Sequence, residues 1–494
     1  SPIFFGVSPP GSSVVITITG KKEKVTIITM NITSCTKEII FKTSKKRDEL
    51  ESYSHSKVTN HWRLNMGLRI YSFLLIFVFT VGSGESRVAL QDVPLKKEPL
   101  YNTSQTDNFS TLESKIGNGC TINVNGDLIE PQPLFLIPDK DQFWTPTTSG
   151  SIKVSFGAPI EFYCTESFKK PFGDRTSLKV TCAGGRTFLV NGERYEFSEL
   201  SCAQQNYHKA QRTGESCADG STLIEIGFEA GKRFLRTMLV CHDEITQSTI
   251  YVHHKLDPSS AAFQKYVGRR NFIKGDFYDK KNVNNLYTQK KQMETFEEIL
   301  DGDHEQYFDE SKALFLSRGH LSAKTDHIFG PQQLSSFYFI NAAPQWQRFN
   351  AGNWERVEDG VRKFVANRKI FVDCYTGTWG VSELPDASGV PQQLYLSFDA
   401  DDNGQIPVPK LYYRVVVEKA TKRGIVLIGV NNPHITLEEI QESYIICDDI
   451  SEIITWIKWK KDDISKGYSY ACEVNQFAKV VPGLPQFDVK GILY

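Results

Sequence analysis

Residues 317–362 bring together side chains that could cut a phosphodiester bond. His320 follows a glycine, and an imidazole that titrates near neutrality suits removal of a proton from water. Asn350 offers an amide oxygen, and Mg²⁺ is commonly held by few protein oxygens and several waters. Glu358 could hold such waters, and Arg362 could stabilise charge that develops on phosphate. The stretch therefore predicts a metal-dependent phosphodiesterase site.

Each of these residues alone has a more ordinary interpretation. An asparagine near a helix start is usually a cap, a single glutamate is usually solvated, and a lone histidine is usually structural. His327 lies in the same loop and competes with His320 as the base. The joint order and spacing of the residues favour the catalytic interpretation.

Two elements must position these side chains. Residues 311–316 are expected to form a strand that leads into a turn at 318–320. From Asn350 onward, apolar residues at helical spacing predict a helix, and they are Trp354, Val357, Val361, Phe364 and Val365. Asn350, Glu358 and Arg362 fall within roughly 120° of one another on that helix. One flank of the helix could present all three.

Residues 265–291 hold a second cluster, in which basic and aromatic side chains alternate. The basic members are Lys265, Arg269, Arg270, Lys274, Lys280, Lys281, Lys290 and Lys291. Such a patch could follow a phosphate backbone and stack on bases, whereas a solvated charged face is the alternative. Because the formal net charge of the chain is only −1, any affinity for nucleic acid must come from a local patch of this kind.

The chain of 494 residues, with 40% hydrophobic content, has room for roughly two to four domains with well-filled cores. Residues 66–86 read as a signal peptide, since Arg69 precedes about a dozen apolar residues and then small ones, too few to span a bilayer. Residues 1–65 are then not part of the mature protein. Residues 87–117, with sequons at Asn102 and Asn108, suit a linker or a propeptide, and we expect secretion without stable membrane association.

Nine of the ten cysteines follow the leader, so most should pair and at least one should stay free or bond another chain. Residues 118–203 are expected to form a small all-β domain stapled by disulfides, with strands near 151–156, 160–163, 178–180 and 187–190. The pair Asn191-Gly192 predicts a hairpin. Residues 204–494 are expected to mix helices and strands, with strands near 234–240, 250–254, 369–373, 411–417 and 424–430.

Residues 399–404 match the first half of a calcium loop, but Lys410 stands where the loop needs glutamate, and prolines interrupt it. A polar turn between strands is the better interpretation.

Three motifs carry a family resemblance, and they are Ser317-Arg318-Gly319-His320, the run 341–345 and the run 350–359. In this order they resemble the active-site block of the DNA/RNA non-specific endonucleases, which are ββα-metal nucleases. The resemblance extends from about Cys217 to the end of the chain. With the leader and the β domain in front, the whole most resembles the secreted arthropod nucleases that degrade double-stranded RNA, found in gut or saliva. It implies an α+β fold in which a ββα-metal nuclease domain with a mixed or antiparallel sheet follows the small β domain.

The resemblance also implies roles for individual residues. His320 would be the general base, Asn350 the direct Mg²⁺ ligand, with Mn²⁺ as a possible substitute, and Glu358 the anchor of metal-bound water. Arg270 and Arg362 would stabilise the transition state, and Asn341 would orient the substrate or the site. Further substrate contacts are expected from Arg318, Arg269, Lys274 and Gln345. The products would carry 5′-phosphates, and the substrates would be DNA and RNA, single- or double-stranded.

The sequence departs from the family pattern at Ser317, where an aspartate usually precedes Arg-Gly-His. A serine forms hydrogen bonds but brings no charge, which bears on metal choice and rate. Phe337 also stands where some relatives have a polar residue. The alternatives are a catalytically weak nucleic-acid-binding protein and a chain whose main role lies in the β domain as a glycan- or partner-binding module.

Overall fold

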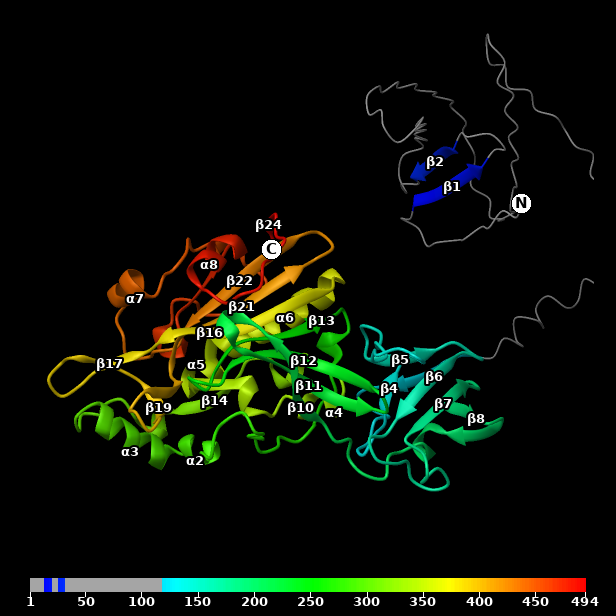
Figure 1. Cartoon of the computed structure of the whole chain (residues 1–494), viewed down its shortest axis with the longest axis horizontal. Coiled ribbons are helices and arrows are strands. Elements are labelled where there is room, and N and C mark those ends of the chain that lie inside the picture. Colours follow the sequence, from blue (N-terminus) through cyan, green and yellow to red (C-terminus); the bar gives the residue numbers. More distant parts are fainter. Residues whose placement is uncertain (1–12, 20–24, 32–117) are drawn as a thin grey trace, which may run out of the picture. The chain divides into compact units, whose positions relative to one another are not determined.

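The computed structural model describes residues 13–19, 25–31 and 118–494, in two compact units that divide after Tyr101 (Figure 1). In the first unit, β1 (Ser13–Thr19) and β2 (Val25–Asn31) form an antiparallel hairpin. The predicted leader at 66–86, the linker at 87–117 and both sequons lie outside the described residues. Within the described residues, no helix is both long and apolar enough to cross a membrane.

The second unit begins with what we call the β segment, residues 118–203, which contains strands β3 to β9. A five-stranded antiparallel sheet has the order β4 (Leu134–Leu136), β6 (Pro159–Tyr163), β7 (Ser177–Cys182), β8 (Thr187–Val190) and β9 (Glu193–Glu196). A second pair consists of β3 (Cys120–Asn123) and β5 (Ser151–Val154). All four strands predicted here are confirmed. Asn191 and Gly192 have φ angles of 52° and 90°, which are those of the tight turn predicted between β8 and β9.

The rest of the unit is built on a nine-stranded sheet, counted over residues 118–494. Its order is β10 (Lys209–Ser216), β11 (Thr222–Ala230), β12 (Arg233–Asp243), β13 (Ser248–Leu256), β16 (Val372–Val381), β21 (Pro409–Glu418), β22 (Arg423–Val430) and β23 (Ser469–Cys472), with β24 (Gly491–Ile492) parallel to β22. The other pairs in the sheet are antiparallel. The strands predicted at 234–240, 250–254, 411–417 and 424–430 are therefore confirmed.

Helices cover both faces of this sheet (Figure 1). Alternate residues of β21 point to opposite sides, so Tyr412 and Val416 join one core cluster while Tyr413 and Val415 join another. The first cluster includes the apolar stripe of α6 (Glu355–Arg368). The second includes side chains of α7 (Leu437–Ser443) and α8 (Val474–Val480). The fold is α+β, as expected.

Smaller elements complete the unit. The helices are α2 (Val283–Leu286), α3 (Gln289–Ile299), α4 (Gly330–Leu334) and α5 (Gln347–Phe349). The short hairpins are β14 (Leu316–His320) with β15 (Ala342–Trp346), β17 (Glu383–Pro385) with β18 (Pro391–Gln393), and β19 (Tyr395–Phe398) with β20 (Gly404–Pro407). Asp399 accepts hydrogen bonds from Asn403 in the turn between β19 and β20, which confirms the polar turn predicted there.

Three predicted elements have different boundaries in the structure. The strand predicted at 311–316 is wrong, because Asp309 caps a 3₁₀ turn at Glu310–Lys312 and β14 itself contains Arg318, Gly319 and His320. The helix predicted from Asn350 begins three residues earlier, because α5 runs directly into a π-helical turn, Asn350–Trp354, which is kinked at Gly352 before the regular α6. The strand predicted from residue 369 begins at Val372, since Lys369 ends α6 in the left-handed conformation.

Four disulfides form among the described residues, and they join Cys120 to Cys182, Cys164 to Cys202, Cys217 to Cys241, and Cys447 to Cys472. Cys374 is free and buried. The expectation of mostly paired cysteines with an odd one free is therefore confirmed.

Gly319 of β14 packs closely against side chains of β15 and β21. A Cβ atom at this position would come within 2.2 Å of the Gln345 side-chain oxygen and 2.7 Å of the Tyr412 hydroxyl. We expect Gly319→Ala to lower the free energy of unfolding by about 1–3 kcal/mol, as overpacked cores usually do. Chemical denaturation measures this. Gly126→Ala is the matched control, because the nearest atom to its added methyl would lie at 3.8 Å; equal losses in both variants would contradict the packing account.

Candidate active site

The β14–β15 hairpin places His320 at its end, opposite Ala342. The ring is only 8% exposed and lies between Phe272 and Phe337, with centroid distances of 4.9 and 5.0 Å. Burial lowers the pKa of His320 to about 3, and the positive charge of Arg269 acts in the same direction. Its Nε2 has no hydrogen-bond partner among the described residues. The imidazole is therefore neutral near pH 7, and its buried Nε2 is not engaged by another group of the described residues.

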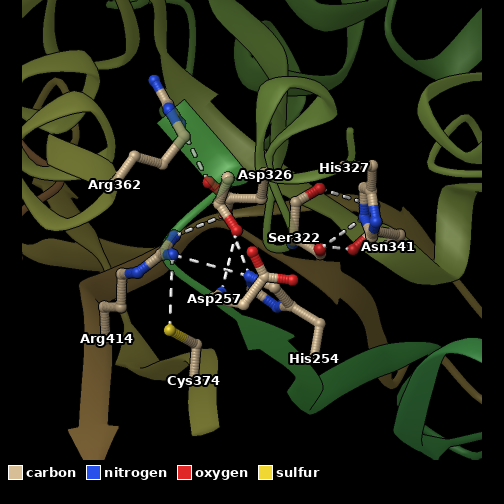
Figure 2. A network of polar contacts seen from close by, with 10 residues as sticks. His254, Asp257, Ser322, Asp326, His327, Asn341, Arg362, Cys374 and Arg414 are labelled. Carbon is tan, nitrogen blue, oxygen red and sulfur yellow. Dashed lines mark hydrogen bonds and ion pairs between the residues drawn. The ribbon is translucent and has the colours of Figure 1, made fainter. Parts of the chain in front are cut away.

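The competing histidine has its corresponding nitrogen engaged. His327 Nε2 lies 3.0 Å from the Ser322 hydroxyl, and both side chains are buried (Figure 2). Burial lowers the pKa of His327 to about 3 as well, so the charge state does not distinguish the two rings. Their hydrogen bonds distinguish the two rings. Because only His327 Nε2 is engaged by a neighbour, His320 is the better candidate for the group that receives a proton.

Asn341 fixes the loop that leaves β14. Its Oδ1 accepts from the Ser322 backbone N–H at 2.8 Å, and its Nδ2 donates to the carbonyl oxygens of Ser322 and Ser336 at 3.0 and 2.8 Å. The side chain is fully buried. Because the buried amide is occupied on both sides, it holds the loop at Ser322 and Ser336 in place and is not exposed to a substrate.

Ser317 sets the direction in which the Asn350 amide points. The Ser317 hydroxyl donates to the Gln345 carbonyl oxygen at 2.9 Å and accepts from Asn350 Nδ2 at 3.0 Å. A hydroxyl has one hydrogen, so once it donates to Gln345 it can only accept from Asn350. The nitrogen of the amide is thereby directed at Ser317, and Oδ1 accepts no hydrogen bond from the described residues. An oriented, free amide oxygen is what a cation ligand requires.

Glu358 and Arg362 follow on α6. Burial raises the pKa of Glu358 to about 7, and the negative charge of Asp326 raises it further against the opposing charges of Arg362 and Arg414. Arg362 Nη1 donates to Asp326 Oδ1 at 2.9 Å, and the arginine is nearly buried. Arg362 is thus tied to a protein carboxylate on one side, while its Nε has no partner among the described residues.

A buried ionic cluster, which sequence reasoning missed, has Asp326 at its centre (Figure 2). The Asp326 carboxylate accepts from Arg362 and Arg414 at 2.9 Å each and lies 2.9 Å from His254 Nε2. Burial alone would raise the pKa of Asp326, but Arg414, His254 and Arg362 hold it well below its usual range. The sequence did contain one indication of this cluster: Arg414 interrupts an apolar stretch of a strand, and a buried arginine needs an anion nearby.

The predicted substrate contacts have different surroundings. Arg269 is exposed, with its guanidinium 5.9 Å from the centre of the Phe337 ring, beside His320. Exposed Arg270 donates to Gln205 at 2.8 Å. Half-buried Lys274 donates to the Asp279 carbonyl oxygen, and Arg318 lies over the Tyr287 ring at 5.2 Å.

Gln345 does not reach the surface. It is fully buried against Gly319, and neither atom of its amide has a partner among the described residues. In this conformation it packs inside the hairpin, away from any substrate.

The donor set suits a divalent cation that keeps several waters better than a metal held by many side chains. Among the residues that the structure describes, no three His, Cys, Asp or Glu side chains gather as a metal site would require. One amide oxygen at Asn350 and one carboxylate at Glu358 remain, and Mg²⁺ tolerates such a sparse set because it keeps several waters.

A histidine-bearing strand pair followed by a helix that carries an asparagine in its first turns defines the ββα-metal class of nucleases. The family model described as DNA/RNA non-specific endonuclease matches residues 219–477, more than half of the chain. The chain belongs to this family, whose members hydrolyse phosphodiester bonds with a divalent metal.

Individual relatives are more distant. The chain is 26% identical to a salivary endonuclease of Lutzomyia longipalpis, over 62% of this chain and 69% of that protein. It is 24% identical to salivary protein Tsal1 of Glossina morsitans morsitans, over 64% and 82% of the two chains. A solved chain from the EndoG/EndoGI complex matches with 19% identity and a TM-score of 0.28, covering 41% of this chain and 74% of that one.

Removing the charge of Asp326 should destabilise the fold strongly. Asp326→Asn leaves buried Arg414 without its anion and leaves Arg362 only Asp359, at 3.9 Å, so we expect a loss of about 3–5 kcal/mol in the free energy of unfolding. The folded-state pKa of Asp326 lies below its usual value, so its contribution is complete above about pH 5 and is lost as the pH falls through 4 and below. Denaturation at several pH values should therefore show the gap between wild type and variant shrinking in acid. A gap that widened in acid would contradict this assignment.

Proposed function

We propose that this protein is a secreted, magnesium-dependent endonuclease that hydrolyses DNA and RNA, double-stranded RNA included, with little sequence preference. Two observations carry the proposal: His320 is neutral and its Nε2 has no partner among the described residues, and the amide nitrogen of Asn350 is bound by Ser317, which leaves the amide oxygen unengaged. These two groups are the proton acceptor and the cation ligand that phosphodiester hydrolysis needs.

In the proposed mechanism His320 Nε2 takes a proton from a water that attacks phosphorus in line with the leaving oxygen. When bound, Mg²⁺ supplies positive charge for the phosphate and the leaving oxygen. Asn350 would hold the ion directly, and Glu358 would accept hydrogen bonds from its waters. Arg269, exposed beside His320, would contact a phosphate oxygen, and Asn341 would keep the histidine loop in position.

Arg362 and Arg270 have separate parts in this proposal. Arg362 is held by Asp326, with Asp359 at 3.9 Å from its other terminal nitrogen, and would contribute its charge from beneath the site because it is buried. The resemblance implies that Arg270 stabilises the transition state; because Gln205 holds it, we propose instead that it binds backbone phosphate away from the cleaved bond, together with Lys274 and Arg318.

Secretion is supported by the four disulfides, which persist in oxidising compartments, and by relatives described as salivary proteins. We propose the leader at 66–86 and a boundary near residue 204 between the β domain and the nuclease domain. The alternative of a weak binding protein rests on Ser317 as a mark of decay. The hydrogen bonds of Ser317 argue against this alternative, since the serine still binds and orients the amide of Asn350.

Substituting the two candidate bases separately tests the assignment of the proton acceptor. We expect His320→Ala to lower kcat on plasmid DNA by about 10²–10⁴-fold, the usual contribution of a general base. His327→Ala should lose much less, because that ring is engaged with Ser322. Folding of both variants is checked by circular dichroism. If folded His320→Ala kept full activity, His320 would not be the base.

Changing Ser317 should alter metal binding. Ser317→Ala removes the acceptor for Asn350 Nδ2, and we expect the Mg²⁺ concentration at half-maximal rate to rise about tenfold, as losses of ligand-orienting partners usually cause. Calorimetric titration of the protein with Mg²⁺, without nucleic acid, should show the same weakening. Ser317→Thr, which keeps the hydroxyl, is the control. Unchanged Mg²⁺ affinity in the alanine variant would remove the orienting role of Ser317.

A further inference from the structure

We propose that the β segment is a working part of the substrate-binding surface, because it holds a basic strap, residues 263–274, in place beside His320. The strap would bind the phosphate backbone on one side of the cleaved bond. This inference rests on the proposed function and deepens it, since it assigns the β segment to nucleic-acid binding instead of to a separate partner.

The strap is anchored to the active site at its far end. The Phe272 ring packs 4.9 Å from the His320 ring, and the neighbouring Ile273 exchanges backbone hydrogen bonds with Phe337 and Phe339. Lys324, in the loop after His320, donates to the Val267 carbonyl oxygen. The strap thus runs directly along the wall of the proposed catalytic site.

The side chains that the strap presents to solvent suit nucleic acid. Lys265, Arg269 and Arg270 are exposed, and Tyr266 is completely exposed, at 101%. Apart from isolated pairings, the strap belongs to no helix or strand, so its conformation depends on contacts made by its backbone and its few buried side chains. Exposed arginines contact phosphates without reading sequence, and an exposed tyrosine can stack on a base.

The near end of the strap is clamped by Asn125 of the β segment. Asn125 Nδ2 donates to the Phe263 carbonyl oxygen at 2.9 Å, and its Oδ1 accepts from the Lys265 backbone N–H at 2.7 Å. One side chain therefore grips the backbone on both sides of Gln264. The residues joined are separated by about 140 positions in the chain, so this is a contact between distant elements.

A buried amide cluster fixes the residue between the two clamped positions. The Gln264 side-chain oxygen accepts from Gln132 of the β segment at 3.0 Å and from the Gly330 backbone N–H at 2.7 Å. The Gln264 carbonyl oxygen accepts from Gln333 at 2.8 Å. Phe135 of the β segment also packs against Phe329, with ring centroids 5.3 Å apart. The β segment, the strap and α4 thus meet in one buried junction.

A third contact reaches a strap arginine directly. Arg270 donates to Gln205, and the next residue, Asn206, donates to the Gln132 carbonyl oxygen at 2.7 Å and accepts from the Thr165 N–H at 2.9 Å. Tyr207 then stands 66% exposed. The connection after the β segment is therefore fastened to it and in turn directs Arg270.

An irregular segment that is already ordered in the free protein binds more tightly. The entropic cost of ordering it arises when the protein folds, and it does not arise again when the nucleic acid binds. Releasing the clamp should then weaken binding of a long duplex while leaving the chemical step alone. The effect should pass through Arg269 and Arg270, whose phosphate contacts the clamp would position.

The test compares Asn125→Ala with wild type, both with His320 intact because its ring anchors Phe272. Binding is measured by fluorescence anisotropy with a labelled duplex of about two helical turns, in excess chelator so that the duplex is not cut. We expect the Kd to rise about five- to tenfold and the dependence of log Kd on log salt to become shallower, as phosphate contacts are lost. Gln205→Ala, which frees Arg270, should act in the same direction. Lys179→Ala, which removes an exposed ion pair with Asp139 inside the β segment, is the matched control and should bind like wild type.

A double-variant cycle decides whether the clamp acts through the strap. In a protein that already carries Arg269→Ala and Arg270→Ala, Asn125→Ala should cost less than twofold in Kd, because the contacts it positions are gone. An equal cost in both backgrounds, or no cost in either, would overturn the inference. In the active protein, KM should rise and kcat should hold. Anisotropy measures binding and needs no cutting. If the wild-type protein proved inactive, the proposed function would be wrong, but the binding comparison would still test the role of the strap.

Discussion

The buried carboxylate of Asp326 is the interaction on which the candidate site depends. It binds Arg362 of α6, Arg414 of β21 and His254 of β13, and it lies in the loop that follows His320. Three elements far apart in the chain are thereby tied to the loop that connects β14 and β15. A buried charge without partners costs far more than a paired one, so each member of the cluster forces the others into place.

The candidate site has two parts with different chemical roles. The hairpin supplies a neutral histidine whose pKa is lowered by burial, and the kinked start of the α6 helix supplies an oriented amide. Ser317 links them, because it lies on β14 and bonds across to Asn350. The serine that departs from the family pattern therefore has a positional role that does not require a negative charge.

Local patterns in the sequence predicted much of this. Alternation along the strands, the Asn191-Gly192 turn and the helical stripe from Trp354 were all readable from the chain, as was the order of the motifs around His320. Contacts between residues far apart in the chain could not be predicted from the sequence. Neither the burial of Gln345 nor the Asp326 cluster has a local signature, and the strand containing Arg318 to His320 was mistaken for a turn because glycine also permits close strand packing.

The most direct test of the account is digestion of DNA and RNA duplexes of matched sequence by the purified protein, with Mg²⁺, with excess chelator, and with Mg²⁺ restored. A histidine that activates water beside a cation needs no 2′-hydroxyl, so both duplexes should be cut internally, cutting should stop with chelator, and it should resume with the metal. Cutting of RNA alone that persists in chelator would contradict the account, because it would point to attack by the 2′-hydroxyl. So would the absence of cutting under all three conditions.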